Sequence, residues 1–365
     1  MTISAPADSR TGTRVYAEYG RPFWMRLLLT REMAVIVALI LVIVIASLEV
    51  RRFGTTTTLG FLLLDVAPIL MIALPMTLVI MMGEIDLSVA STLGLSSVLL
   101  GILTQAGWPV PVAIVACLVM GLVAGLINGL LVTVVGLPSL AVTIGTLALY
   151  RGIAVGLLGT TAVTSFPAFW TGLAQSKFGS TGIPVAMVLV VALIVVFVAL
   201  LHFTPFGRGI VAIGFSTETA HFSGVHVNRT KVVAFMLTGL IAALAGIYWT
   251  FRYGSARGDN AMGLELSVIA AVLLGGVSIF GGKGAIHGVI AGVLLIGVLQ
   301  SALRLANVSS DVINIITGAL LILSVLSPDF CRGSAACVSV VPRQRNRSSN
   351  RSVPSPDHQH PLHPT

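Results

Sequence analysis

The sequence predicts an all-α, polytopic membrane protein with about ten transmembrane helices, some of them broken or re-entrant. Hydrophobic residues make up 56% of the 365 residues and charged residues only 9%, whereas soluble domains contain about 25% charged residues. Runs of mostly apolar residues recur along the chain and approach the roughly 20 residues with which a helix spans a bilayer. Lipid is therefore the expected solvent, and the net charge of +8 does not indicate a nucleic-acid partner.

Ten apolar runs define the expected spans. They cover residues 33–50, 60–82, 87–104, 109–135, 138–159, 183–203, 232–254, 265–280, 284–305 and 311–327. The fifth and eighth runs are short or interrupted by glycine, so they are the candidates for re-entrant segments. The first run follows a polar lead of 32 residues and lacks a small-residue cleavage site, which predicts a span and not a signal peptide.

Basic residues orient the predicted helices. Ten spans place both termini on one side, and if that side is the cytoplasm, 14 Lys and Arg residues lie inside and six outside. This bias agrees with the positive-inside rule and predicts cytoplasmic termini. The expected organisation is a basic cytoplasmic segment at 1–32, a transmembrane domain at 33–327 and a basic tail at 328–365, whose Pro- and Ser-rich composition is typical of disorder.

Two carboxylates interrupt the apolar sequence between the second and third runs. Glu84 and Asp86 stand two residues apart, which puts them on different faces of a helix and argues against a paired-carboxylate catalytic site. Asp86 directly precedes the run that begins at Leu87, so its carboxylate, or the hydroxyl of Ser88, is a candidate cap for the helix start. The alternatives are a pathway or gate through the membrane and a proton relay. Capping predicts that Asn, but not Leu, can replace Asp86.

Further polar residues lie within or beside the apolar runs. Arg151, in the fifth run, is an ionisable group in a membrane segment and therefore a functional candidate, with snorkelling to the interface as the alternative. Asn128 and Thr143 either line a polar pathway or form hydrogen bonds between helices. Glu265 opens the eighth run and is a candidate cap for that helix.

Small residues recur at the spacing of helix contacts. Gly121, Gly125 and Gly129 fall on one face of the fourth run. Helices in lipid associate through such small-residue faces because they allow close approach of the backbones. The stripe predicts a close helix contact, either fixed or mobile.

Residues 204–231 form the longest internal polar connection on the predicted cytoplasmic side. A short helix is expected within it, capped by Ser216 or Thr217, with Glu218 at the positive end of the helix dipole and Gly224 closing it in a left-handed conformation. Such a helix suits docking to another protein, and an ordinary structured loop is the alternative. The candidate docking residues are Ser216, Thr217, Glu218, Thr219, Ala220, His221, Phe222, Ser223 and Gly224.

Four segments together resemble a known transporter family. They are GEIDLSVAS (83–91), LPSLAVTIGTLALYRGIAVGL (137–157), AIGFSTETAHFSGVHVNRTK (212–231) and VIAAVLLGGVSIFGGKGAIHGVIAGVLLIGVLQSAL (268–303). In this order they resemble the signatures of permease subunits of ribose-type ABC sugar importers, with the rhamnose and autoinducer-2 branch the most similar. The chain departs from the family pattern at Ala90, where a glycine is typical, and at residues 215–217 and 220–221, within the segment that contains the docking helix.

The resemblance implies a division of labour in a bacterial inner membrane. Such permeases pair with a second permease copy or a paralogue around a central pathway, dock two ATPase subunits at cytoplasmic coupling helices and receive a sugar or sugar-like solute from an extracytoplasmic binding protein. For such a permease, six residues are candidates for the pathway or gate, namely Glu84, Asp86, Ser88, Asn128, Thr143 and Arg151. The chain itself is expected to bind no cofactor, with ATP and Mg on the partner subunits.

The sequence also bears on ATP binding and on two rival functions, a stand-alone secondary transporter and an intramembrane enzyme. An ATPase would need a Walker A loop, and GGVSIFGGKGA (275–285) fails because Gly284 follows the lysine and Val277 replaces the first glycine. A stand-alone secondary transporter would need several buried charges near the membrane midplane, where Arg151 is the clear candidate. An enzyme is not expected, because no two of the seven histidines pair at metal-ligand spacing within a run.

Overall fold

The computed structural model describes residues 31–179 and 182–336, and nearly all of its regular structure is helical. Its internal contacts divide the chain into residues 1–325 and 326–365, and the interactions described below belong to the first part. Within the described residues the only β-type pairings are two isolated bridges, Val163 with Ala256 and Lys177 with Pro184. The all-α prediction is confirmed. The expected segment 1–32 and tail 328–365 lie largely outside the described residues.

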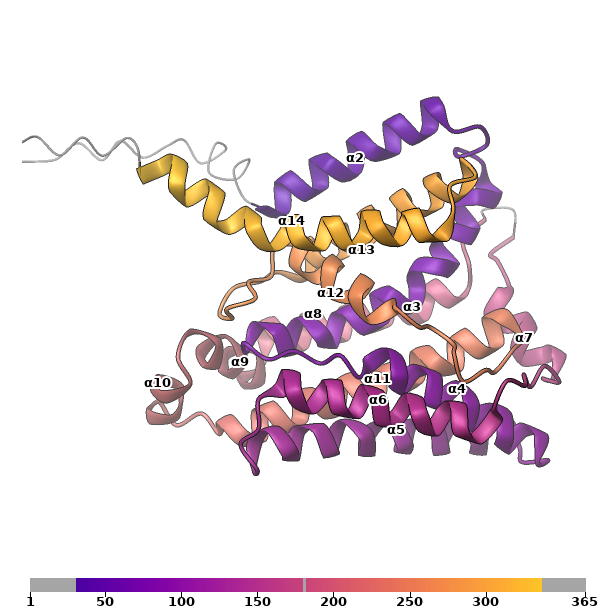
Figure 1. Ribbon diagram of the computed structural model, residues 1–365, viewed down its shortest axis with the longest axis horizontal. Helices are drawn as coiled ribbons and strands as arrows, with labels where there is room; N and C mark the ends of the chain where they lie inside the picture. The colour runs from indigo at the N-terminus through magenta and orange to yellow at the C-terminus, as the bar shows by residue number, and fades with distance from the viewer. Residues whose placement is uncertain (1–30, 180–181, 337–365) are drawn as a thin grey trace, which may run out of the picture. The chain divides into compact units, whose positions relative to one another are not determined.

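Thirteen helices are described, and Figure 1 shows them with their labels. They are α2 (Arg31–Glu49), α3 (Thr56–Met81), α4 (Val89–Gln105), α5 (Val110–Thr133), α6 (Ser139–Leu158), α7 (Ala168–Gln175), α8 (Ala186–Phe203), α9 (Pro205–Phe215), α10 (Thr217–Phe222), α11 (Val227–Tyr253), α12 (Leu264–Leu274), α13 (Ile286–Leu305) and α14 (Ser310–Ala336).

Seven of the described helices are long and apolar enough to cross a membrane: α2, α3, α5, α6, α8, α11 and α13. Helices α4 and α12 and residues Ser310–Leu323 of α14 are shorter apolar segments, so a count of ten spans stays a prediction. The fifth run forms one uninterrupted helix, α6, which is long enough to span a membrane. The eighth run is broken as expected, because α12 has only 11 residues and the chain from Gly275 to Ala285 is not helical.

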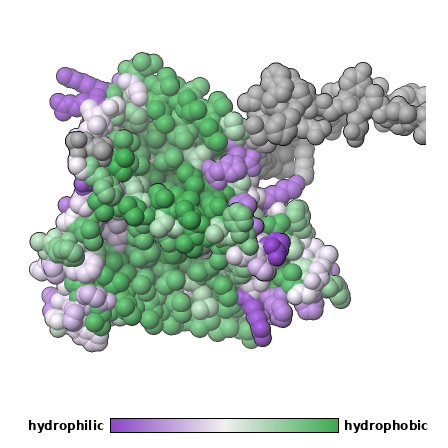
Figure 2. Space-filling model, turned by 180° about the vertical axis from the view of Figure 1, so that it is seen from behind, coloured by the Kyte–Doolittle hydropathy of each residue, from purple (hydrophilic) through white to green (hydrophobic). Residues whose placement is uncertain are grey.

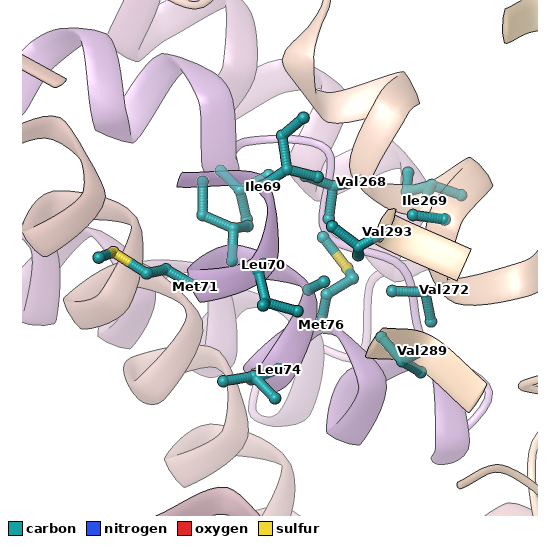
Figure 3. Packing of buried hydrophobic residues seen from close by; sticks show 14 of the residues in the cluster. Ile69, Leu70, Met71, Leu74, Met76, Val268, Ile269, Val272, Val289 and Val293 are labelled. Atoms are coloured by element: carbon teal, nitrogen blue, oxygen red, sulfur yellow. The ribbon is translucent and has the colours of Figure 1, made fainter. Parts of the chain in front are cut away.

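Helix α3 forms the centre of the core. Of its most apolar 18-residue window, 89% is buried, and Figure 3 shows its side chains meeting those of α12 and α13. The labelled residues are Ile69, Leu70, Met71, Leu74 and Met76 from α3, Val268, Ile269 and Val272 from α12, and Val289 and Val293 from α13. A helix that is apolar on all sides can pack against apolar neighbours in every direction, as α3 does here.

The outer helices instead expose apolar side chains. Only 17% of the apolar window of α8 is buried, and its outward side chains include Val188, Val191 and Val195. Figure 2 shows a broad hydrophobic band on one face, with the more polar side chains gathered toward its two ends. Exposed apolar area of this extent indicates a surface that contacts lipid, as expected of a polytopic membrane protein.

The helices connect at two opposite ends, which we call the α10 end and the α7 end (Figure 1). At the α10 end lie residues 82–88, α9, α10 and the start of α11, and the amide of Gly282 donates to the carbonyl of Met81 at 2.9 Å. At the α7 end, Val163 and Ala256 exchange backbone hydrogen bonds of 3.0 and 2.9 Å. The C-terminal end of α3 therefore lies at the α10 end, and its N-terminal end lies on the opposite side of the helical layer, at the α7 end (Figure 1).

Helices α5 and α11 pack closely through the glycine stripe. A Cβ atom added at Gly125 would meet the carbonyl oxygen of Phe235 and the Cα of Met236, and one at Gly121 would meet Gly239. The predicted close helix contact is confirmed, and its partner is α11. Backbone surfaces in such contact leave no room for a side chain, so the stripe is a packing surface.

Candidate functional site

The segment between α3 and α4, residues 82–88, is a buried break in the helices. Asp86 is only 1% exposed, and its Oδ1 accepts hydrogen bonds from the backbone amide of Ser88 at 2.9 Å and from the Ser88 hydroxyl at 2.6 Å. Helix α4 begins at Val89 and not at Leu87, and Ser88, in the N-cap position, makes no side-chain capping bond. The prediction of a side-chain cap is therefore wrong in detail, because Asp86 fixes the turn that leads into the helix.

Asn128 joins this break to α5. Its Nδ2 donates to the Ser88 hydroxyl at 2.8 Å, while the Ser88 carbonyl accepts from the hydroxyls of Ser91 and Thr92 at 2.8 and 3.0 Å. Asn128 Oδ1 is buried and has no hydrogen-bond partner within the described part of the chain. Asp86, Ser88 and Asn128 thus form one buried chain of hydrogen bonds, which together with the Ser88 carbonyl ties the break to α4 and α5.

The start of α6 holds the break from another side. The Thr143 hydroxyl donates to the carbonyls of Ser139 at 2.8 Å and Ile85 at 3.2 Å. The Ile85 amide in turn donates to the Ser139 hydroxyl at 3.2 Å. Thr143 therefore forms hydrogen bonds between segments, and its hydroxyl is engaged in holding the backbone of the break.

Glu84 connects the break to α11 at the α10 end. Its Oε1 lies 2.5 Å from Lys231 Nζ, and the two side chains are 14% and 15% exposed. Five of the six candidate pathway residues thus meet around one segment. Among the described cavities none is lined by them, and each has a structural partner.

We expect the Glu84–Lys231 pair to stabilise the α10 end. A hydrogen bond between charged groups is worth about 1.5–3 kcal/mol, so Glu84→Gln and Lys231→Met should each lower the melting temperature of the detergent-solubilised protein. The exchange of both charges, Glu84→Lys with Lys231→Glu, should recover part of the loss. Equal melting temperatures for the single variants and the wild type would contradict this role.

Arg151 points into the protein and does not snorkel to the surface. Its Nη1 donates to the carbonyls of Gly258 at 2.9 Å and Asn260 at 2.7 Å, and its Nη2 to that of Ala90 at 3.1 Å. Asn260 donates onward to the Ser97 hydroxyl at 2.9 Å. The guanidinium therefore binds α6 to the start of α4 and to the connection between α11 and α12, and the snorkelling alternative is wrong.

Glu265 lies in the first turn of α12, whose N-cap position is taken by Gly263 with a φ of 82°. Its Oε2 is buried and unpartnered within the described residues. The expectation that Glu265 caps this helix is therefore wrong, since the chain enters α12 through a left-handed residue that favours glycine.

The predicted short helix in residues 204–231 is α10. Ser216 occupies its N-cap position, and the Ser216 hydroxyl accepts a hydrogen bond from the Thr219 amide at 3.2 Å. Gly224 follows with a φ of 82°, the left-handed conformation expected at a helix end. Phe222 is 89% exposed, and beside it lies an open hollow of about 390 Å³ lined by residues that include His221, His226 and Arg229.

Sequence reasoning missed α9, which precedes α10. The signal was present, because Thr204 and Pro205 form a typical helix start, and the Thr204 hydroxyl accepts from the Gly207 amide at 3.3 Å. Gly214, near the end of α9, lies against the carbonyl of Met81 and the backbone of Gly282. The exposed helix α10 is thus attached through α9 to the end of α3.

A polar cavity of about 440 Å³ near the α7 end was also missed. It lies among α3, α11, α12, α13 and α14, and its polar lining includes Asp65, Gln300, Arg304, Asn314 and Thr317. The available signal was the isolated polar residues within apolar helices, such as Asp65 and Gln300, because intramembrane polar groups usually face a cavity or a partner.

Two aromatic residues and an ion pair form part of this cavity. The rings of Trp249 and Tyr253 have centroids 4.8 Å apart. Asp65 Oδ2 lies 3.2 Å from Arg304 Nη1, and Asp65 Oδ1 accepts from the Tyr253 hydroxyl at 3.3 Å. Arg252 approaches the same carboxylate at 3.7 Å.

Among the described residues, no group of three His, Cys, Asp or Glu side chains is arranged to hold a metal.

Comparisons with known proteins give a consistent result. The family described as "Branched-chain amino acid transport system / permease component" matches residues 58–325. The autoinducer 2 import system permease protein LsrD of Salmonella typhimurium is 36% identical over 301 residues, covering 81% of this chain and 90% of the relative. The LsrD protein of Escherichia coli O157:H7 is 37% identical over 308 residues, covering 83% and 93%. No solved structure matches the chain.

Proposed function

Because the chain belongs to the permease component family of branched-chain amino acid transport systems, we propose that it is the membrane-spanning subunit of an ATP-binding-cassette importer for a sugar-like solute. The relatives are named as autoinducer 2 import permeases, which favours autoinducer-2 itself or a related solute such as rhamnose or ribose. The solute would cross the bacterial inner membrane by alternating access, in which packed helices change their arrangement around a fixed site.

The observation that carries this proposal is the capped, exposed helix α10. It presents Phe222 at 89% exposure beside an open hollow whose lining includes His226 and Arg229, and an aromatic side chain and an arginine beside a hollow suit a protein contact. We propose that an ATPase subunit docks here, which makes the α10 end cytoplasmic. ATP and Mg then belong to that partner, and this chain performs transport without hydrolysis of its own.

A route for mechanical coupling leads from α10 to the core. Movement of α10 is passed to α9, and Gly214 of α9 rests on the carbonyl of Met81 at the end of α3 and on Gly282. The break at 82–88 follows at once and is held to α11 by the Glu84–Lys231 pair. Close backbone contact transmits displacement because packed segments cannot be compressed.

Further partners follow from the same proposal. A second permease copy or a paralogue would complete the pathway, and an extracytoplasmic solute-binding protein would deliver the solute at the α7 end. Both chain termini would then lie in the cytoplasm, in agreement with the five arginines that precede the first span and with the positive-inside rule.

The proposal is tested by co-purification from native membranes in mild detergent. Wild-type protein should recover an ATPase subunit, and a variant in which a Gly/Ser linker replaces residues 217–223 should not. Phe222→Ser should weaken recovery, whereas Phe169→Ser, a matched change of a 70% exposed phenylalanine in α7, should leave it unchanged. Recovery with both the wild type and the linker variant would move the docking site elsewhere, and recovery with neither would contradict the importer proposal and favour an ion-gradient-driven transporter.

A further inference from the structure

We propose that the polar cavity near the α7 end is the solute-binding site of this chain and that its ligand is a neutral polyol of the size of a pentose or a hexose. The inference rests on the proposed transport function and adds the position of the site and the groups of this chain that would bind the solute. Its volume of about 440 Å³ lies within the range of small-molecule sites, which is about 300–1,000 Å³.

The lining groups match the hydrogen-bonding needs of a sugar. Gln300 and Asn314 each offer an amide donor and an acceptor, and Thr317 offers a hydroxyl. The contact between Gln300 Nε2 and Thr317 Oγ1 is long, at 3.4 Å, so these groups can exchange it for better bonds with a ligand. A polyol has many hydroxyls that donate and accept at once, and a lining of mixed neutral groups suits it.

The charges in the cavity favour a neutral ligand. The two charged lining residues, Asp65 and Arg304, form an ion pair of 3.2 Å. Arg252, which is not part of the lining, lies 3.7 Å from the same carboxylate, so the carboxylate of the lining is already paired on two sides. A cationic solute would have to compete with both arginines for Asp65, and an anionic solute would have to displace Asp65 from Arg304. A polyol can instead bridge the pair, with one hydroxyl donating to the carboxylate and another accepting from the guanidinium, which are the stronger, charge-assisted kind of hydrogen bond.

An aromatic wall completes the site. Trp249 and Tyr253 both line the cavity, and their rings lie close and tilted by 48°. A sugar ring has an apolar face of C–H groups as well as polar edges, and an aromatic side chain provides an apolar surface for it while its polar atoms remain free to form hydrogen bonds. Aromatic, amide and paired charged groups in one small cavity therefore point to a carbohydrate.

The cavity also has the position that a transport site requires. Five helices contribute to it. One of them, α12, has only 11 residues and ends at Leu274, and its cap residue Gly263 and first residue Leu264 lie in the cavity wall. Non-helical backbone within a membrane domain is found where it lines a cavity or a protein interior, and transporters place solute sites at such broken helices. Rearrangement of α12 against α3 and α13 would change the cavity directly.

The test is ligand binding to the full-length chain in lipid nanodiscs, measured by saturation-transfer NMR with ribose, rhamnose and autoinducer-2 as probes. We expect at least one neutral probe to bind the wild type, and Gln300→Leu and Asn314→Leu to weaken that binding by about tenfold or more. Gln105→Leu, a matched change at an exposed residue outside the cavity and near the same end, should bind as the wild type does.

Each contrary result has a distinct meaning. Unchanged binding in both cavity variants would overturn the location, and absence of binding by all three probes, or tighter binding of ribose 5-phosphate than of ribose, would overturn the chemical class. The co-purification of an ATPase with the Gln300→Leu variant serves as the separate readout. If the ATPase is recovered while solute binding does not depend on the cavity, the site inference fails and the importer proposal stands.

Discussion

Replacement of Asp86 by leucine is expected to prevent the membrane domain from folding stably. The Asp86 carboxylate is buried and accepts two hydrogen bonds from Ser88, which in turn accepts from Asn128. Leucine would leave the amide and hydroxyl of Ser88 buried without their acceptor. Each unsatisfied group costs about 1–3 kcal/mol, so two of them cost about 2–6 kcal/mol. The upper part of this range reaches the free energy of unfolding of many proteins, which is about 5–15 kcal/mol.

Asparagine at position 86 distinguishes hydrogen bonding from charge. Its amide oxygen can still accept from Ser88, so Asp86→Asn should cost about 1 kcal/mol and retain most of the transport. Size-exclusion profiles and melting curves in detergent measure folding, and solute uptake by cells that express each variant measures transport. A folded Asp86→Asn protein that has lost transport as completely as Asp86→Leu would show that the charge itself is needed and would overturn the structural role.

Features encoded by neighbouring residues were predictable from the sequence. The capping serine of α10 and the left-handed Gly224 lie within nine residues of each other, and both were located from local preferences alone. The glycine stripe of α5 was likewise predictable from the sequence, because its spacing places all three residues on one face of the helix. In each case the physical cause acts over one or two helical turns.

Features that depend on distant residues were not predictable in the same way. Arg151 is held by carbonyls that lie 61 to 109 residues away in the sequence, and nothing in its own segment identifies them. Asp86 was correctly expected to hold the break, but its partner Ser88 is itself fixed by Asn128, 40 residues farther along. The polar cavity needs five helices at once, so single polar residues in apolar runs were its sole signal.

Helix α3 connects the two regions to which function is assigned. Asp65 lines the proposed solute site, and Met81, at the other end of the same helix, contacts α9 and Gly282. Pro68 and Pro75 lie between them, and each lacks the amide hydrogen that would complete the helical ladder. Under the proposed function, a displacement at the docking surface would therefore be transmitted through α3 to the solute site.

The packing of α5 on α11 leads to a prediction of opposite effects at two glycines. Gly125→Ala should destabilise the protein by about 1–3 kcal/mol, and Gly125→Leu should prevent folding, because any Cβ at this position meets the backbone of Phe235 and Met236. Gly145 lies in α6 with no atom within 4 Å of an added Cβ. Gly145→Ala should therefore leave the melting temperature unchanged or raise it, since alanine favours a helix over glycine by about 1 kcal/mol.

Melting temperatures of the purified Gly125→Ala and Gly145→Ala variants separate steric contact from helix preference, and the size-exclusion profile of Gly125→Leu shows whether that variant folds. Both glycines lie inside helices, so helix preference alone predicts the same direction of change at each. A gain in stability for Gly125→Ala would show that α5 and α11 can move apart without loss, which would make this contact a mobile interface and not a fixed one. The size of the loss at Gly125 therefore measures how firmly the α5–α11 pair is held while other helices rearrange around it.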